Sequence, residues 1–315
     1  MSPKTLLRPV LLASLLMAGQ LAHAADTLRI GYQKSSTLIS LLKSQGALEH
    51  ALAGQNITVS WHEFPNGQPL LEALNVGNID VSADVADTVP VFAQAAGADL
   101  VYFAQEAPSP SAQAIIVRAD SPIKTLADLK GKKIAVTKAA GVHYLLIAAL
   151  NQAGLKFSDI EPAYLTPADG RAAFENRKVD AWVTWEPFLS GAQQHLSTRT
   201  LTDGQGLADY QRYYLTTSRF AQDHPKVLQT LFGELVKAGD WLRAHPRQGA
   251  EILGPLWGNL DPAIVEKANA KRSYQVRLVQ PESLVEQQKI ADAFHAASLL
   301  PKSVDARDVR LWGAP

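Results

Sequence analysis

The chain carries one strand–loop–helix pattern twice, and this repeat constrains its fold more than any other feature. In the first copy, residues 28–32 (LRIGY) predict a strand, followed by a polar loop at 33–36 and then apolar residues at helical spacing. The second copy has its strand at 133–136 (KIAV), its loop at 137–141 and a helix after it. Two such units predict two α/β lobes whose strand carboxyl ends and helix amino ends face a shared ligand cleft.

Both copies continue in the same way, with a second helix, a second strand and an acidic residue near a proline. The second strand begins at an Ile-Asp or Val-Asp pair, and the acidic residues are Asp87 and Glu186. These two carboxylates therefore occupy equivalent places in the two lobes. They can cap helix amino ends, bind an amine of a ligand, or do neither.

Composition fits two globular lobes and argues against a nucleic-acid partner. The chain has 315 residues, of which 47% are hydrophobic and 19% are charged. Thirty basic residues balance thirty acidic ones, and no long Lys/Arg run is present. We therefore expect no nucleic-acid binding and no attraction to an anionic membrane.

Residues 1–24 have the pattern of a signal peptide. Two basic residues precede an apolar stretch at 10–18, and Ala22-His23-Ala24 matches a cleavage site. The stretch is shorter than the roughly 20 residues of a membrane-spanning helix, although an anchor or a buried first helix is the alternative. Because the chain has no cysteine, disulfides, thiolate metal sites and lipid-modified cysteines are excluded. We expect a soluble protein exported to a bacterial periplasm.

The chain divides into three expected segments around two crossings. Residues 25–110 form the first part of lobe 1, residues 111–214 form lobe 2, and residues 215–315 return to lobe 1. Prolines at 108–110 mark the first crossing, and a β-rich run at 213–217 marks the second.

Catalytic and metal-binding motifs are absent from the sequence. There is no nucleophile elbow, zinc-protease motif, P-loop or dinucleotide fingerprint, and the eight histidines are not spaced as metal ligands. We therefore expect no cofactor, no metal and no enzymatic activity. An enzyme of the same fold is the alternative, with Asp87, His143 and Glu186 as its only candidate acids and bases.

Two polar loops are the better candidates for a binding site. Gln33, Ser35 and Ser36 lie between a strand and a helix, although Ser35 or Ser36 is equally an ordinary helix cap. The matching loop of lobe 2 contains Gly141, which permits a close backbone approach, and its alternative is a plain strand-to-helix turn. Trp185, at the carboxyl end of a strand, is the aromatic residue that we expect to face the cleft.

Several longer motifs resemble the aliphatic sulfonate-binding proteins of bacterial ABC importers. The resemblance rests on residues 31–34 (GYQK), 63–65 (EFP), 71–77 (LEALNVG), 92–102 (FAQAAGADLVY), 121–124 (SPIK), 127–131 (ADLKG), 152–157 (QAGLKF), 164–169 (YLTPAD) and 179–182 (VDAW). It covers nearly the whole mature chain and becomes weaker after about residue 204.

The resemblance implies a two-lobed type II periplasmic binding protein fold that closes on an organosulfur anion and delivers it to a membrane permease. It also implies a monomer without a cofactor. The implied ligand-binding residues, carried over position by position, are Gln33, Asp87, Lys138, Ala139, Ala140, Gly141, His143, Trp185, Glu186 and Arg272, and Ser35 and Ser36 of the first polar loop join them as expected site residues. Arg272 is a natural partner for an anion, because its planar guanidinium offers paired donors.

Two stretches depart from the family pattern and leave the ligand open. Residues 139–142 read Ala-Ala-Gly-Val where family members often have a Gly-Ser-Ser-Ser run, and the expected loop at 82–86 also differs. A taurine, sulfate ester, nitrate or thiamine-precursor binder is therefore an alternative, as is a ligand-sensing module that signals to a membrane receptor.

Overall fold

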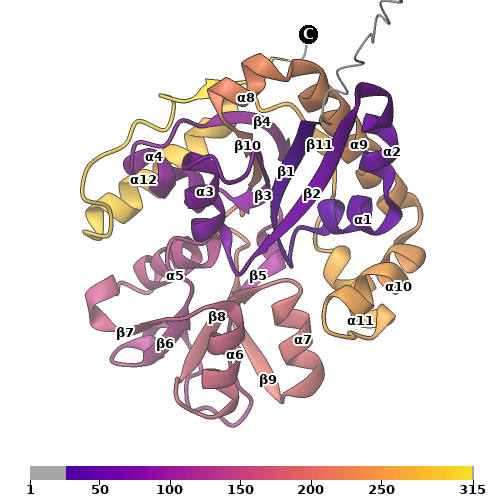
Figure 1. Ribbon diagram of the computed structural model, residues 1–315. Helices are drawn as coiled ribbons and strands as arrows, with labels where there is room; N and C mark the ends of the chain where they lie inside the picture. Colours follow the sequence, from indigo (N-terminus) through magenta and orange to yellow (C-terminus); the bar gives the residue numbers. More distant parts are fainter. Residues whose placement is uncertain (1–25, 314–315) are drawn as a thin grey trace, which may run out of the picture.

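The computed structural model describes residues 26–313, and it shows two α/β lobes joined side by side (Figure 1). The expected signal peptide at 1–24 lies outside the described residues. The fold predicted from the repeated motif is confirmed, because each copy supplies parallel strands to a sheet of its own. Within the described part of the chain, no helix is both long and apolar enough to cross a membrane.

Lobe 1 is built on a sheet with the strand order β11-β4-β10-β3-β1-β2, and β12 also pairs with β4. β1, β2 and β3 are parallel, whereas β10 runs antiparallel between β3 and β4. The strands are β1 (Asp26–Gln33), β2 (Ile57–Phe64), β3 (Val81–Ala86), β4 (Val101–Glu106), β10 (Arg212–Thr216), β11 (Val276–Arg277) and β12 (Arg310–Leu311).

Helices cover both faces of this sheet, and the longest shows why they form. α9 has Pro225 in its first turn, where a proline costs no hydrogen bond, and it buries residues at helical spacing from Val227 to Leu242. The helices of lobe 1 are α1 (Thr37–Gln45), α2 (Ala47–Leu52), α3 (Gly67–Asn75), α4 (Thr88–Ala95), α8 (Ser218–Asp223), α9 (Pro225–Ala244), α10 (Pro246–Leu256), α11 (Pro262–Asn269) and α12 (Leu284–Ala296).

Lobe 2 is built on a smaller sheet with the order β7-β6-β8-β5-β9. β6 is parallel to β7 and β8, while β5 is antiparallel to β8 and β9. Its elements are β5 (Gln113–Arg118), β6 (Lys133–Val136), α5 (Gly141–Gln152), β7 (Glu161–Tyr164), α6 (Pro167–Glu175), β8 (Ala181–Trp185), α7 (Phe188–His195) and β9 (Thr198–Asp203).

Two crossing segments, 107–112 and 204–211, join the lobes. The two segments are hydrogen-bonded to each other. The amide of Ser109 donates to the carbonyl of Asp209 (2.9 Å), and the amide of Gly204 donates to the carbonyl of Pro110 (3.1 Å). β10 begins at Arg212, so this strand spans the expected boundary at 214/215 and belongs to the sheet of lobe 1.

One sequence interpretation was wrong. The stretch 82–86, expected to be a loop, lies within strand β3, and all six residues of that strand are buried. Its polar residues, Ser82 and Asp84, concealed the strand pattern. Asp84 is buried because it pairs with arginines from distant parts of the chain, a partnership that local sequence does not reveal.

Candidate functional site

The strand ends that carry the candidate residues face one another between the lobes. In lobe 1, the carboxyl ends of β1, β3 and β4 lie beside the start of the antiparallel strand β10, where Arg212 pairs with Ala86 and Glu106. In lobe 2, the carboxyl ends of β6 and β8 lie beside the start of β5, where Gln113 pairs with Trp185. Both edges adjoin the crossing segments.

The loop after β1 is closed by its own polar groups. The amide of Ser36 donates to the carbonyl of Gln33 (2.8 Å), and the amide of Gln33 donates to Ser36 Oγ (3.2 Å). The side-chain amide of Gln33 donates to the carbonyl of Asp84 (3.3 Å). Gln33, Ser35 and Ser36 are thereby held buried against the end of β3.

Helices α1 and α5 begin at the facing edges without a side chain capping their first amides. By contrast, Asn66, Thr166 and Thr217 accept hydrogen bonds from the first amides of α3, α6 and α8. Exposed donors and the helix dipole favour an anion at a helix amino end. Both lobes therefore present such an end towards the space between them.

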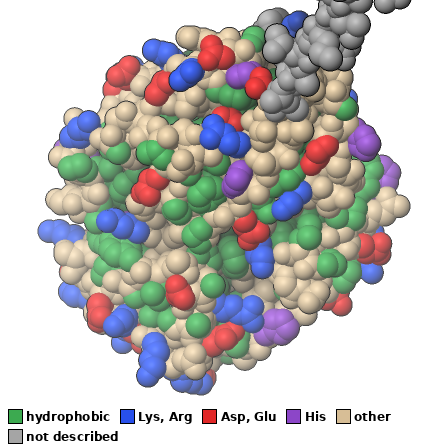
Figure 2. Space-filling view, viewed as in Figure 1, with side chains coloured by type: hydrophobic (Ala, Val, Ile, Leu, Met, Phe, Trp, Pro, Cys, Tyr) green, Lys and Arg blue, Asp and Glu red, His purple; other side chains and the backbone are tan. Residues whose placement is uncertain are grey.

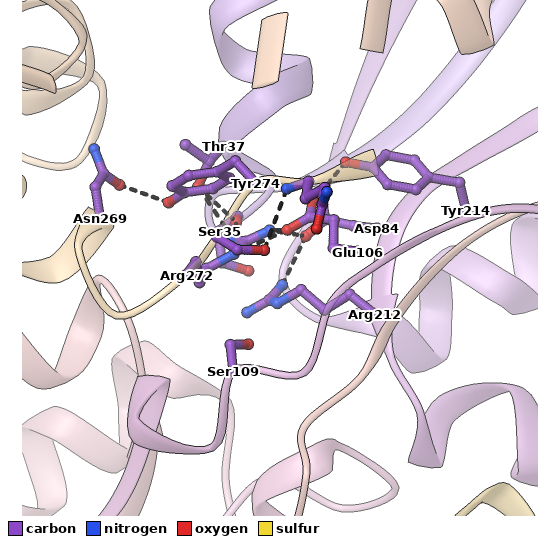
Figure 3. A network of polar contacts seen from close by, with 12 residues as sticks. Ser35, Thr37, Asp84, Glu106, Ser109, Arg212, Tyr214, Asn269, Arg272 and Tyr274 are labelled. Carbon is purple, nitrogen blue, oxygen red and sulfur yellow. Dashed lines mark hydrogen bonds and ion pairs between the residues drawn. The ribbon is translucent and has the colours of Figure 1, made fainter. Parts of the chain in front are cut away.

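A buried charge cluster lies beneath the start of α1 and consists of Asp84, Glu106, Arg212 and Arg272 (Figure 3). Arg212 Nη1 is 2.7 Å from Asp84 Oδ2. Arg272 Nη2 is 3.1 Å from the same Asp84 oxygen and 2.6 Å from Glu106 Oε2. Two arginines thus face two carboxylates, although burial raises the pKa of Asp84 against the attraction of both arginines.

Arg272 is held by several elements of lobe 1 at once. Its Nη1 donates to the carbonyl of Ser35 (3.1 Å) and to Thr37 Oγ1 (3.2 Å), and its guanidinium lies over the ring of Tyr274. Burial alone would lower the pKa of Arg272, but Glu106 and the other nearby oxygens outweigh it and raise that pKa well above its usual value. Arg272 therefore remains charged and fixes the loop that begins α1.

Some polar atoms of this region are buried without a hydrogen-bond partner. They include Asp84 Oδ1 and Arg212 Nε. Leaving a buried polar group unpaired costs about 1–3 kcal/mol, so such atoms are expected where a polar ligand supplies the partner. Ser109, on the first crossing segment, lies across from Arg212 (Figure 3).

The loop before α5 meets lobe 1 at a point with no room for a side chain. A methyl group on Gly141 would collide with the ring of Tyr210 and would lie 2.9 Å from the Cβ of Ala86. Ala139 has a positive φ of 58°, a conformation that favours glycine, and Ala140 adopts extended backbone just before the helix. The backbone of this loop, rather than its methyl side chains, therefore faces lobe 1.

The two remaining residues of this loop have different surroundings. Lys138 is exposed, with Nζ 5.8 Å from the ring centre of Tyr164. His143 is buried among Phe157, Tyr164 and Phe294, and its Nδ1 accepts from the amide of Ala139 (3.3 Å). Burial, helped by Lys138, lowers the pKa of His143 to about 3. The imidazole is therefore neutral and orders the loop.

Trp185 and Glu186 follow each other at the end of β8. Trp185 is buried, and its ring packs edge-to-face on Phe188 with 5.5 Å between centroids. Glu186 accepts from the amide of Ser190 (3.1 Å), from Ser190 Oγ (2.9 Å) and from Lys271 Nζ (2.5 Å). This carboxylate is thus fully engaged with groups of the protein.

Asp87 joins the start of α4 to the second crossing segment. Its carboxylate accepts from the amides of Thr88 and Gln211, each at 2.9 Å, and its own amide donates to the carbonyl of Gln211. Burial raises the pKa of Asp87 to about 7, although the two amides favour the charged form. Asp87 therefore holds the crossing segment in place.

The structure brings together some of the expected residues, gives Asp87, Lys138, His143, Trp185 and Glu186 separate surroundings, and adds others. Gln33, Ser35, Ser36 and Arg272 share one network, and Gly141 faces Tyr210 beside Ala86. Sequence reasoning missed Asp84, Glu106, Arg212 and Tyr210. Glu106 and Arg212 are charged residues at one end of a mainly apolar strand, whereas Asp84 lies inside β3 and Tyr210 lies in the second crossing segment, where no sequence signal marks them. Within residues 26–313, no group of His, Asp and Glu side chains is arranged to hold a metal ion.

Comparison with known sequences identifies the family. The sequence profile described as NMT1/THI5 like matches residues 53–249 of this chain. The chain belongs to the NMT1/THI5-like family. A relative in Escherichia coli (strain K12), named as an aliphatic sulfonates-binding protein, is 43% identical over 305 residues, which are 96% of this chain and 94% of that protein.

Two solved structures of similar proteins share the arrangement of this NMT1/THI5-like protein. The periplasmic aliphatic sulphonate binding protein SsuA of Escherichia coli is 42% identical, with a TM-score of 0.82 over 92% of this chain and 93% of that one. The alkanesulfonate-binding protein SsuA of Xanthomonas axonopodis pv. citri, bound to MOPS, is 40% identical, with a TM-score of 0.83 over 89% and 96%. The family resemblance and the periplasmic binding protein fold are confirmed.

Proposed function

We propose that this chain is the periplasmic substrate-binding component of an ABC importer for aliphatic sulfonates. The similarity over nearly the full length to alkanesulfonate-binding proteins, one of them bound to the sulfonate MOPS, carries this proposal. The protein captures the sulfonate between its lobes and delivers it to a membrane permease. It acts as an exported, soluble monomer and does not transform its ligand.

Backbone and hydroxyl donors of both lobes hold the sulfonate head in this proposal. Ser35 and Ser36 contribute from the start of α1, and Ala140 and Gly141 contribute backbone from the start of α5. A sulfonate has three oxygens with one shared charge, so several donors placed around it suit it better than a single one. Charge-assisted hydrogen bonds contribute about 1.5–3 kcal/mol each, and three or four of them support micromolar affinity.

The charge cluster has a supporting function in this proposal. Because Arg272 is paired with Glu106 and Asp84, it orients the Ser35 loop rather than supplying a free positive charge. Arg212 keeps its Nε without a partner and contacts the hydroxyl of Tyr210 (3.2 Å). We assign Arg212 as the cationic donor to the ligand, and Tyr210 and Trp185 as the apolar wall beside its organic part.

Thermal unfolding of the mature protein with a panel of anions tests the function. The panel contains short and long alkanesulfonates, taurine, a sulfate ester, sulfate, nitrate and a thiamine precursor. A ligand at about 100 times its dissociation constant stabilises the folded state by about 2.7 kcal/mol, which raises the midpoint by a few degrees. We expect this rise with alkanesulfonates and none with nitrate.

The same panel identifies the alternatives. A rise with taurine or a sulfate ester alone would shift the ligand class while keeping the transport function. No rise with any sulfonate would contradict the proposed function. Mass spectrometry of the recovered ligand is the control for catalysis, because an unchanged compound after long incubation is expected of a binding protein.

A further inference from the structure

One ion pair joins the two lobes outside the crossing segments. Lys271 Nζ, just after α11 in lobe 1, lies 2.5 Å from Glu186 Oε1, just after β8 in lobe 2. Every other ion pair found among residues 26–313 lies within a single lobe. We name Lys271 and Glu186 the inter-lobe ion pair.

The acceptor of this pair is held in place by lobe 2 alone. The two oxygens of Glu186 accept from the amide and the hydroxyl of Ser190, in the first turn of α7, and only 4% of its side chain is exposed. These bonds do not depend on lobe 1. The carboxylate therefore keeps its orientation whether or not the lobes are together.

The donor is held in place by the binding region of lobe 1. Lys271 directly precedes Arg272, whose side chain is fixed by Glu106, Asp84 and the carbonyl of Ser35. α11 packs on α7, and a Cβ on Gly191 of α7 would lie 3.5 Å from Leu260, so the pair forms where the lobes are already in contact. The position of the Lys271 backbone is therefore tied to the loop that begins α1.

We propose that the inter-lobe ion pair stabilises the closed arrangement of the lobes and so slows ligand release. Glu186 then acts in closure and does not contact the ligand, and Lys271 is a positioning residue that the sequence did not reveal. The test by ligand affinity rests on the proposed sulfonate-binding function, whereas the test by distances between spin labels does not.

The size of the effect follows from the exposure of the pair. Separation of the lobes would leave both charges hydrated. The free energy that the pair contributes to closure is therefore its attraction minus the cost of removing water from the two charges. Because 29% of the Lys271 side chain is exposed, solvent screens the attraction in part. We expect loss of the pair to weaken ligand binding about three- to tenfold, mainly through faster dissociation.

A double-mutant cycle on the mature protein tests the pair, with MOPS and butane-1-sulfonate as probes. Lys271→Gln and Glu186→Gln should each weaken binding by the expected factor, the double variant should lose no more than either one, and high salt should reduce the differences. Lys267→Gln removes an exposed charge from α11, the helix just before Lys271, and should leave affinity unchanged. If the Glu186→Gln variant binds the anion more tightly, the carboxylate faces the ligand, and if the two effects multiply, the two residues act independently. Either result would make the proposal wrong.

Distances between spin labels test closure without reference to a ligand. The chain has no cysteine, so Gln194→Cys on α7 and Lys226→Cys on α9, both exposed, place one label in each lobe. We expect Lys271→Gln to shift the ligand-free distribution towards longer distances, and the exchanged pair Lys271→Glu with Glu186→Lys to restore it. Identical distributions in all variants would overturn the proposal, even if sulfonate binding itself is established.

Discussion

Asp87 is a buried carboxyl whose charge state depends on pH in the physiological range. Its carboxyl is buried between α4 and the second crossing segment, and burial raises its pKa to about 7. In the unfolded chain, an aspartate has a pKa near 3.9. Between about pH 4 and pH 7 the folded state therefore holds a proton that the unfolded state has lost, and this stabilisation disappears as pH rises through 7.

Asp87→Asn should remove this dependence on pH. Denaturant unfolding should show the free energy of unfolding of the unmodified protein falling by about 2.7 kcal/mol more than that of the variant between pH 5 and pH 8. Asp308→Asn changes an exposed carboxylate and should leave the difference unaltered. Equal pH dependence in all three proteins would place the carboxyl of Asp87 at its ordinary pKa.

The sequence predicted the positions of some site residues but not the contacts of others. The loops containing Gln33, Ser35 and Gly141 follow predicted strands, so their positions were predictable from the repeat. The surroundings of Arg272 were not, because its partners Asp84 and Glu106 are 188 and 166 positions away in the sequence. A buried charge is stable only beside such partners, and only the folded chain brings them together.

Among the secondary-structure elements, α5 of lobe 2 makes a close contact with lobe 1 at its first residue. Its first residue, Gly141, touches Tyr210 and Ala86, while the rest of the helix packs in the core of lobe 2. Sequence periodicity predicted this helix, because apolar residues recur along it. The close approach of Gly141 to Tyr210 and Ala86 depends on the missing side chain of that residue, which periodicity does not report.

Gly141→Ala should weaken ligand binding without lowering the stability of the ligand-free protein. Alanine has a higher helix propensity than glycine by about 1 kcal/mol, so the ligand-free protein should unfold at a similar or higher temperature. The new methyl group should hold α5 away from lobe 1 and weaken sulfonate binding at least about tenfold, which calorimetric titration would measure. Gly233→Ala, on α9 with open space around it, is the matched control and should bind normally. Normal affinity in Gly141→Ala would show that the lobes need no closer approach.

At the scale of the whole molecule, the two lobes share a hydrophobic core on one flank. Phe294 of α12 packs edge-to-face on Phe92 of α4 and on His143 of α5, with 4.9 Å between centroids in each case. α12 comes from the last part of the chain, after both crossing segments, and it connects lobe 1 to lobe 2. The sequence predicted the return of the chain to lobe 1, but not this contact with lobe 2.

Phe294→Ala should therefore affect both lobes. Truncating a buried phenylalanine costs about 3–5 kcal/mol, and loss of the shared contact should divide one calorimetric transition into two. Phe220→Ala, at a half-buried position that packs on the core of lobe 1, should cost less and leave a single transition. A single, unshifted transition in Phe294→Ala would mean that α12 does not couple the lobes.

The position of β10 determines the order in which the chain is able to fold. Lobe 2 is continuous in sequence, from β5 to β9, and its sheet is complete once residue 203 has emerged. β3 and β4 of lobe 1 emerge earlier but have no direct pairing, because β10 lies between them. During synthesis or export from the amino end, the second lobe therefore completes its sheet first. The sheet of the first lobe stays incomplete until β10, which begins more than 100 residues after β4 ends, has emerged.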